Sequence, residues 1–392
     1  NQPRVVLHST ALNDLIQKAW LWRSPRSVDA LAILGVLLLG AIATWLRGTL
    51  PVLLLWIAGV AACFFLSGFS IVKIGRVPGL MNVGVVWTLA TFVELGRRQS
   101  YEFIQRLKLR STMSLYFSPR IMEHVLKNPG SMEPQQAEIT TLLTDLRNST
   151  PLAELLGPGG MFKLLNQVFE TQTQAILAED GSMEHFLGDQ FLSYWGAPDP
   201  QPDAADRAFR AAQSLIAGME DLRTKLEPNL KALFGYGVAL HSGTALSGNK
   251  GSAQRLDYGL VGDLINAAAR VESLTKHYGV LFLITREAYA KLSNPPFTRL
   301  VDKVVVKGTT LPLELLEVKH PFSSEDFEEI AGRYNEAFAE YERGEFIAAE
   351  RAFAVLAQEK QDKPSALMAE RCRELAADSP PEWNGIYQLK TK

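Results

Sequence analysis

Residues 183–195 read MEHFLGDQFLSYW, in which a Gly-Asp pair separates two apolar, aromatic-rich runs. Such a pair between strand-like runs is typical of a tight hairpin turn. The carboxylate of Asp189 then lies at the tip of the hairpin, four residues after His185. Upstream, the β-branched, alternating stretch EITTLLTD predicts a strand that ends at Asp145. If the strand and the hairpin are neighbours in a sheet, the two carboxylates meet at one edge.

Two carboxylates that lie close together repel each other unless a cation sits between them. Magnesium prefers hard oxygen ligands and typically uses one or two carboxylates together with substrate phosphates. Further along the chain, GLVGDLINAAARVESLTK places Asn266 and Arg270 four residues apart, on one face of a predicted helix. An amide and a guanidinium there are suited to hold a phosphoryl oxygen. A common turn aspartate and an exposed helix face remain the plainer alternatives.

Helical and strand-like patterns alternate around these residues and indicate one α/β domain. The segment SGTALSGNKGS, after the strand predicted at 235–241, indicates a glycine-rich loop and a short strand. The predicted helices are 157–177, 204–222 and 263–275, and the other predicted strands are 138–145, 257–261, 280–284, 298–306 and 312–318, with the hairpin at 184–195.

Three uncharged apolar stretches, 30–46, 51–72 and 77–93, lie in the N-terminal quarter of the chain. A membrane-spanning helix needs about 20 apolar residues, so the second stretch is long enough and the other two are at the short limit. Buried core helices are the alternative. We predict three transmembrane helices within 28–95. Basic residues follow the third stretch, which predicts that its C-terminal side faces the cytoplasm.

The net charge of −2 gives no electrostatic argument for nucleic-acid binding, and two cysteines cannot form a disulfide framework or a zinc site. Residues 96–134 are predicted to be a connector helix. Residues 321–392 are predicted to be a helical extension that forms a hairpin capping the domain or a dimer; its pattern also resembles a single tetratricopeptide-type repeat, which is the alternative. Its tail, 380–392, is predicted to be extended and anchored by Trp383 and Tyr387.

Taken together, EITTLLTDLRNST, EHFLGDQFLSYWGAP, FGYGVALHSGTALSGNKGS and RLDYGLVGDLINAAARVES resemble the class III adenylate/guanylate cyclases. The resemblance implies an α+β domain of ferredoxin-like βαββαβ type at 135–320. It also implies that ATP is converted to 3′,5′-cyclic AMP and pyrophosphate at the interface of a homodimer, with two Mg²⁺ (or Mn²⁺) ions at each active site.

The roles of individual residues follow from the same resemblance. Asp145 and Asp189 match the metal-binding aspartates, and the backbone carbonyl of Leu146 matches a main-chain metal ligand. Asn266 and Arg270 match the pair that orients the ribose and stabilises the transition state. Lys307 matches a lysine that reaches the terminal phosphates.

The positions that select the base depart from the family. His185 stands where adenylate cyclases usually have lysine and guanylate cyclases usually have glutamate, and Gly259 stands where adenine selection usually uses Asp or Thr. A neutral imidazole offers one donor that can reach adenine N1; packing of His185 within the strand is the alternative. Strand alternation points Glu184 to the other face. Ser149 also replaces a phenylalanine usual in the family.

Three functions therefore remain open. The leading one is an adenylate cyclase. The second is a guanylate or promiscuous nucleotidyl cyclase, and the third is a catalytically silent nucleotide-binding signalling module.

The N-terminal part of the chain resembles the end of a CHASE2 sensor domain and its membrane anchor. We expect residues 1–27 to be the tail of an extracytoplasmic sensor, most of which precedes this sequence. The same resemblance implies a multi-pass protein of a bacterial inner membrane, with the catalytic domain in the cytoplasm.

Overall fold

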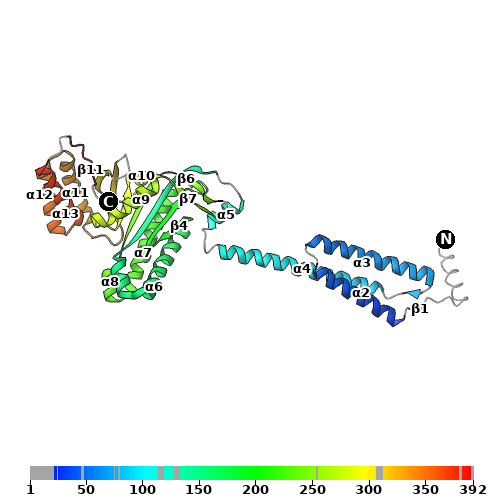
Figure 1. Cartoon of the computed structure of the whole chain (residues 1–392). Coiled ribbons are helices and arrows are strands. Elements are labelled where there is room, and N and C mark those ends of the chain that lie inside the picture. Colours follow the sequence, from blue (N-terminus) through cyan, green and yellow to red (C-terminus); the bar gives the residue numbers. More distant parts are fainter. Residues whose placement is uncertain are drawn as a thin grey trace, which may run out of the picture. The chain divides into compact units, whose positions relative to one another are not determined.

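The structure is a computed structural model of the 392-residue chain. It describes residues 22–23, 25–45, 48–74, 76–77, 80–113, 119–127, 133–252, 255–305, 312–378 and 382–389. The chain divides into two compact units, Asn1–Thr112 and Met113–Lys392. In Figure 1 the first is coloured blue to cyan and the second cyan to red.

In its described residues the first unit is mainly helical, and each of the three uncharged stretches lies largely within one helix. It consists of α2 (Arg26–Trp45), α3 (Thr49–Phe69), the π-helical turn η1 (Ser70–Ile74) and α4 (Leu80–Met113), with a short parallel pair formed by β1 (Trp22–Arg23) and β2 (Arg76–Val77). Small residues allow α3 and α4 to pack closely: a Cβ atom on Gly59 would lie 2.7 Å from Trp87 Nε1. Trp56 Nε1 donates a hydrogen bond to Thr88 Oγ1 at 3.2 Å.

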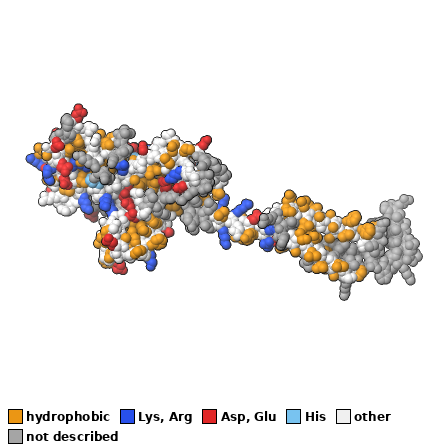
Figure 2. Space-filling model, viewed as in Figure 1, with side chains coloured by type: hydrophobic (Ala, Val, Ile, Leu, Met, Phe, Trp, Pro, Cys, Tyr) orange, Lys and Arg blue, Asp and Glu red, His pale blue; other side chains and the backbone are white. Residues whose placement is uncertain are grey.

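Large apolar side chains cover the outside of this helical unit, as Figure 2 shows. Leu31, Phe64 and Val93 are 68%, 78% and 72% exposed. Extensive exposed apolar surface marks a membrane or protein interaction site. Among the described helices, one segment, Thr49–Val72, is long and apolar enough to cross a membrane, and α2 contains a shorter apolar stretch, Ile33–Ile42.

The prediction of three transmembrane helices thus has support at the second stretch and stays a prediction at the other two. Residues 1–21 lie outside the described part, so the predicted sensor tail is not tested. The predicted connector is divided between the C-terminal end of α4 and a separate helix, α5 (Pro119–Lys127).

The second unit is built on a mixed sheet, which within the described residues has nine strands in the order β11-β9-β10-β8-β6-β3-β5-β4, with β7 paired to β6. The strands are β3 (Gln135–Arg147), β4 (Ser182–Leu187), β5 (Gln190–Trp195), β6 (Gly235–Ser252), β7 (Arg255–Val261), β8 (Phe282–Thr285), β9 (Thr298–Val305), β10 (Leu313–Val318) and β11 (Tyr387–Gln388). The helices are α6 (Ser149–Ala178), α7 (Ala204–Lys225), α8 (Pro228–Leu233), α9 (Asp263–Tyr278), α10 (Arg286–Tyr289), α11 (Phe327–Glu342), α12 (Phe346–Lys360) and α13 (Lys363–Ala377).

From β3 to β6 the chain runs strand–helix–strand–strand–helix–strand, with the short helix α8 added after α7, and the four strands are ordered β6-β3-β5-β4. This is the split βαβ arrangement of ferredoxin-like folds, so the predicted α+β class is confirmed. Side chains alternate along β3. Leu142 and Leu146 pack in the core with α6 and α7, whereas Leu143 packs with Ala268 of α9. Asp145 has the same parity as Leu143 and therefore lies on the α9 side of the sheet.

Two predicted element boundaries were wrong. Residues 235–252 form one long strand rather than a strand, a loop and a short strand. The glycine-rich part stays extended because β6 pairs with β3 from Gly235 to Ser247 and with β7 from Leu246 to Ser252. Helix α6 begins at Ser149 instead of residue 157, and a kink at Gly157 (φ 65°) separates its first turns from the predicted part.

In the described residues of the C-terminal extension there are three helices, α11, α12 and α13, so the prediction of a single helical hairpin was wrong. The predicted anchors of the tail are confirmed. The Trp383 ring lies 5.0 Å from the Tyr341 ring and 5.2 Å from the Phe346 ring, between centroids. Tyr387 lies in β11, which pairs in parallel with β9.

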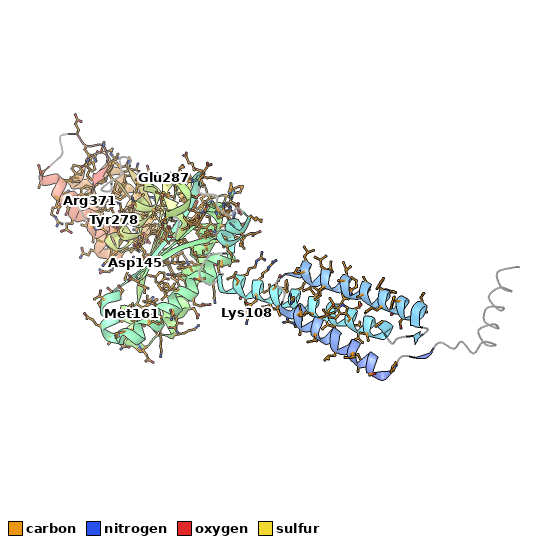
Figure 3. All side chains as sticks on the ribbon, turned by 45° about the vertical axis from the view of Figure 1, so that its right-hand side comes forward. Lys108, Asp145, Met161, Tyr278, Glu287 and Arg371 are labelled. Carbon is orange, nitrogen blue, oxygen red and sulfur yellow. The ribbon has the colours of Figure 1, made fainter. Side chains whose placement is uncertain are left out.

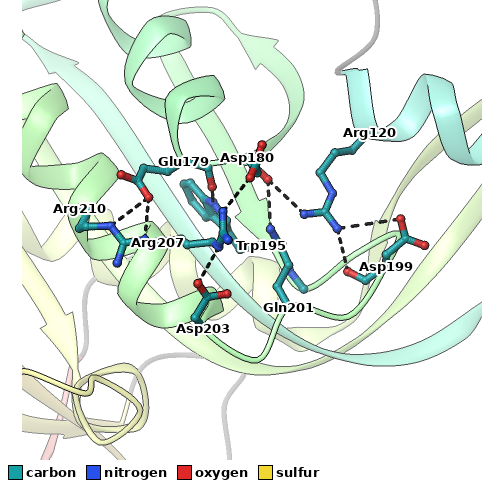
Figure 4. A network of polar contacts seen from close by, with 10 residues as sticks. Arg120, Glu179, Asp180, Trp195, Asp199, Gln201, Asp203, Arg207 and Arg210 are labelled. Atoms are coloured by element: carbon teal, nitrogen blue, oxygen red, sulfur yellow. Dashed lines mark hydrogen bonds and ion pairs between the residues drawn. The ribbon is translucent and has the colours of Figure 1, made fainter.

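Figure 4 shows a polar network that holds the turn before β4. Arg207 pairs with Asp180 and Asp203 at 2.7 and 2.8 Å. Trp195 Nε1 donates to the backbone carbonyl of Glu179 at 2.8 Å. Arg120 of α5 donates to the backbone carbonyls of Asp180 and Asp199 at 3.5 and 3.3 Å. The network therefore connects α5 and α7 to the turn that leads into β4, the strand that carries Glu184.

Candidate active site

The structure brings the two predicted metal-binding carboxylates, Asp145 and Asp189, together at one edge of the sheet. β3 pairs antiparallel with β5 as far as Thr144 opposite Phe191. Asp189 lies in the two-residue turn just before β5, after Gly188, whose φ of 69° favours glycine. β3 continues to Arg147, so Asp145 lies within the strand instead of ending it. Leu146, the predicted main-chain ligand, follows it with its backbone opposite Tyr236 of β6.

The environment of Asp145 fits a bound cation. Asp145 Oδ1 is buried and has no hydrogen-bond partner within the described part of the chain. Burial and then the Asp189 charge raise the pKa of Asp145, while the backbone N–H of Leu146 and the charge of Lys276 act in the opposite direction. A buried carboxylate oxygen without a partner, next to a second carboxylate, is an arrangement that a divalent cation relieves.

Among the described residues, no group of three or more His, Cys, Asp or Glu side chains is arranged to hold a metal ion. An ion at Asp145 and Asp189 would therefore complete its coordination with water or with substrate oxygens. Mg²⁺ commonly binds in this way.

Helix α9 carries the other two predicted catalytic residues on its N-terminal half. The Asn266 side chain is exposed and that of Arg270 is half-buried. No hydrogen bond or ion pair between described residues joins either side chain to Asp145 or Asp189. On the C-terminal half of α9, the charge of Lys276 lowers the pKa of Asp145, and the charge of Asp145 raises the pKa of Glu272. Within the described residues, the electrostatic contacts between α9 and the carboxylates thus involve its C-terminal half and not Asn266 or Arg270.

Glu272 is a buried carboxylate that sequence reasoning did not single out. It is 6% exposed, and burial and then the Asp145 charge raise its pKa to about 7. It lies over Gly237, the residue opposite Asp145, where a Cβ atom would be 2.6 Å from Glu272 Oε1. The sequence signal that could have identified Glu272 is its position among the residues of α9 that face the core, such as Val271 and Leu274.

Glu184 lies against Gly259, contrary to the expectation from strand alternation that it points away from the base-selecting residues. A Cβ atom on Gly259 would lie 2.7 Å from Glu184 Oε1 and 2.8 Å from Lys250 Nζ. Glu184 Oε1 and Lys250 Nζ form an ion pair at 2.7 Å, and the Glu184 side chain is 11% exposed. The pairing of β4 with β5 shifts register between Met183 and Phe186, the part of the strand that carries Glu184.

Two of the predicted substrate-binding residues are not tested. The side chain of His185 and all of Lys307 lie outside the described part of the structure. The backbone of His185 belongs to β4.

A family model described as the adenylate and guanylate cyclase catalytic domain matches residues 132–318. This part of the chain belongs to the adenylate and guanylate cyclase family. The chain is 26% identical over 209 residues to adenylate cyclase 1 of Rhizobium meliloti (strain 1021), a match that covers 53% of this chain and 31% of that protein. It is 32% identical over 186 residues to an adenylate cyclase of Anabaena cylindrica, which covers 46% of this chain and 36% of that protein.

Among solved structures, an adenylyl cyclase from P. aeruginosa matches with 24% identity and a TM-score of 0.43, covering 50% of this chain and 100% of that one. The chain spans about a third of the length of the curated relatives above. The family assignment confirms the cyclase resemblance of this domain, and it does not test the CHASE2 resemblance of the N-terminal part.

We predict that Glu272→Gln stabilises the metal-free protein at pH 8 by about 1–3 kcal/mol and leaves its stability at pH 4 unchanged. The folded-state pKa of about 7 lies above the ordinary value of 4.5. At pH values below the ordinary pKa, the protonated Glu272 carboxyl therefore makes its full contribution to the free energy of unfolding. This contribution is lost as the pH rises through the folded-state pKa. Glutamine mimics the protonated form at every pH.

Urea unfolding of the full chain in detergent with EDTA, followed by tryptophan fluorescence at pH 4, 6 and 8, measures this difference. Glu154→Gln, an exposed change on α6, is the control. Parallel pH profiles for wild type and Glu272→Gln would contradict the prediction.

Proposed function

We propose that this chain is a membrane-anchored adenylate cyclase that converts ATP to 3′,5′-cyclic AMP and pyrophosphate for intracellular signalling. The observation that carries the proposal is the pairing of Asp145 and Asp189 at one sheet edge of a cyclase domain, with Asp145 Oδ1 buried and without a partner in the described region. Adenylate cyclases among the relatives support ATP as the substrate.

Each predicted residue has a role in this proposal. Asp145, Asp189 and the carbonyl of Leu146 would hold Mg²⁺ or Mn²⁺, two ions at each site. Such ions, when bound, acidify the ribose 3′-hydroxyl and neutralise phosphate charge. Asn266 would orient the ribose, and Arg270 would meet the negative charge that develops on the phosphate in the transition state.

We propose further that the active sites form between two copies of the chain. Asn266 and Arg270 lie on a part of α9 that has no described contact with the carboxylates of the same copy, so a second copy's carboxylates can face them. The β6–β7 arm supports a self-association surface. Leu246 and Val261 lie opposite each other across this arm and are 44% and 53% exposed. Exposed apolar pairs of this kind favour docking of a partner, and two identical faces give a twofold dimer.

The membrane part of the proposal rests on α3, which is long and apolar enough to cross a bilayer, and on the exposed apolar side chains of its neighbours. The basic residues of α4 follow its apolar part, which favours a cytoplasmic location for what comes next in the chain. They are Arg97, Arg98, Arg106, Lys108 and Arg110. A bacterial inner membrane is the proposed location.

The first test is cyclic nucleotide production by the full chain in detergent, supplied with ATP or GTP and with Mg²⁺ or Mn²⁺. We expect cyclic AMP from ATP, and a loss of about a hundredfold or more in Asp189→Asn, because that change removes a carboxylate ligand. Asp221→Asn, an exposed change on α7, is the matched control. Product chiefly from GTP would make the protein a guanylate cyclase. No product from either nucleotide, in a folded dimer, would leave a silent nucleotide-binding module.

The shared site predicts complementation. Asp145→Ala and Arg270→Ala should each be inactive alone, because each damages both sites of a homodimer. Coexpressed, they should recover roughly a quarter of the wild-type activity, because half of the dimers are mixed and each mixed dimer keeps one intact site. An inactive mixture, in which mixed dimers are demonstrated by differential tags, would place each active site within one copy.

A second candidate function, a guanylate or promiscuous cyclase, is favoured by the Glu184–Lys250 pair beside Gly259. Glu184 Oε2 is buried and has no partner within the described residues. A carboxylate accepts from the two N–H groups on the edge of guanine, and a lysine donates to O6. The same pair accepts from the adenine amino group and donates to N1, so both bases can be bound.

We predict that Glu184→Gln lowers kcat/KM for GTP about tenfold more than kcat/KM for ATP, because a glutamine offers one acceptor where guanine presents two donors. Steady-state rates with each nucleotide give the ratio. Glu138→Gln, which is 73% exposed and pairs with Lys291, is the control. An unchanged GTP-to-ATP ratio in Glu184→Gln would exclude this residue from base selection.

A further inference from the structure

A buried charge cluster joins the C-terminal helices to the cyclase domain. Asp302 of β9 is completely buried and accepts hydrogen bonds from the hydroxyl of Tyr278 on α9 and from Arg371 on α13. Arg371, which is 5% exposed, also donates to the Tyr278 hydroxyl at 3.3 Å. Its guanidinium carbon lies 3.9 Å from the centre of the Tyr387 ring. Figure 3 labels Tyr278 and Arg371, whose side chains meet there. One guanidinium thus connects α9, β9, α13 and β11.

A second buried group fixes the start of α13. Arg299 of β9 is 3% exposed and pairs with Glu317 of β10 and with Asp362, the N-cap of α13, whose side chain also accepts from the backbone N–H of Ser365. The first turn of α13 lies on the end of α9, since a Cβ atom on Gly279 would be 2.6 Å from Lys363 Cδ. Both ends of the contact between the two helices are therefore defined by directional or close contacts.

This cluster extends the cyclase domain beyond the family match, which ends at residue 318. Asp302 lies inside the match, and its guanidinium partner Arg371 lies outside it. A buried carboxylate is strongly unfavourable when its cationic partner is removed. The C-terminal helices are therefore part of the structure in which α9 is held, and not a separate appendage.

We infer that Arg371 is a positioning residue for the cyclase reaction, which acts through Tyr278 and Asp302 on the placement of α9. This inference rests on the proposed function, because α9 carries Asn266 and Arg270. Tyr278 ends the helix, eight residues after Arg270, or about 12 Å along the axis.

Apolar contacts alone do not define the position of α9 as sharply. The side chains of Val271 and Leu274 pack on the sheet through contacts without direction, which tolerate small rotations and shifts of the helix. The hydrogen bonds at Tyr278 have a required direction and oppose those movements. A misplacement of about 1 Å at a catalytic group can lower a rate by about a hundredfold.

The experiment is steady-state kinetics of the full chain carrying Arg371→Met, compared with Arg373→Met. Arg373 lies on the same helix, is 69% exposed and pairs with Glu350, so it is a matched control. We expect Arg371→Met to lower kcat about tenfold or more with a KM for ATP within about threefold of wild type, because positioning of the transition state is lost while binding is kept. Arg371→Lys should recover part of kcat, and Arg373→Met should behave as wild type.

Amide hydrogen exchange of the same proteins gives a readout that does not depend on activity. Arg371→Met should raise exchange in 263–278 and leave the protection of β3 and β5 unchanged. An unchanged kcat in folded Arg371→Met would overturn the inference. So would loss of protection throughout the domain, because Arg371 would then support folding in general. If the wild type forms no cyclic product, the proposed function fails. Hydrogen exchange then still tests the inference about Arg371, because unchanged exchange of α9 in Arg371→Met would by itself overturn it.

Discussion

β3 is hydrogen-bonded to β6 from Gln135 to Arg147 and to β5 from Thr140 to Thr144. This double pairing sets the register of the central strand, and the positions of the site residues depend on it. It places Asp145 beside the hairpin turn that carries Asp189, and opposite Gly237, where the absence of a side chain leaves room for Glu272. A slip of one residue would turn Asp145 into the apolar core beneath α6 and α7.

The candidate active site brings the carboxylates of Asp145, Asp189 and Glu272 close together in a partly buried environment. Their mutual repulsion is unfavourable without a cation. Burial raises the pKa of both Asp145 and Glu272; the charge of Asp189 further raises the pKa of Asp145, and the charge of Asp145 further raises that of Glu272. The partnerless oxygen of Asp145 adds to the cost. In the proposed function, a bound cation would offset this loss of stability. The stability of the domain and its proposed chemistry are thus linked through the same carboxylates.

The buried ion pairs at the C-terminal side show a different use of charge. Replacement of a buried pair by apolar residues is often neutral or stabilising, so stability alone does not explain the pairs of Arg371 with Asp302 and of Arg299 with Asp362. Their directional bonds define one placement of α13 against α9 and β9. Placement matters here because α9 is the helix whose N-terminal half carries the proposed catalytic amide and guanidinium.

Local patterns in the sequence were sufficient to predict the hairpin around Asp189, the strand that carries Asp145 and the helix that carries Asn266 and Arg270. They also predicted the apolar N-terminal stretches and the family. These features depend on short-range periodicity, turn chemistry and motif order, which a sequence states directly. The tertiary structure alone decided the unbroken course of β6, the approach of Glu184 to Gly259, the third C-terminal helix and the joining of Arg371 to Asp302. Each of these involves contacts between residues far apart in the chain. Backbone pairing, first with β3 and then with β7, keeps the glycine-rich segment of β6 extended. A buried charge is tolerated where an opposite charge from a distant part of the chain meets it.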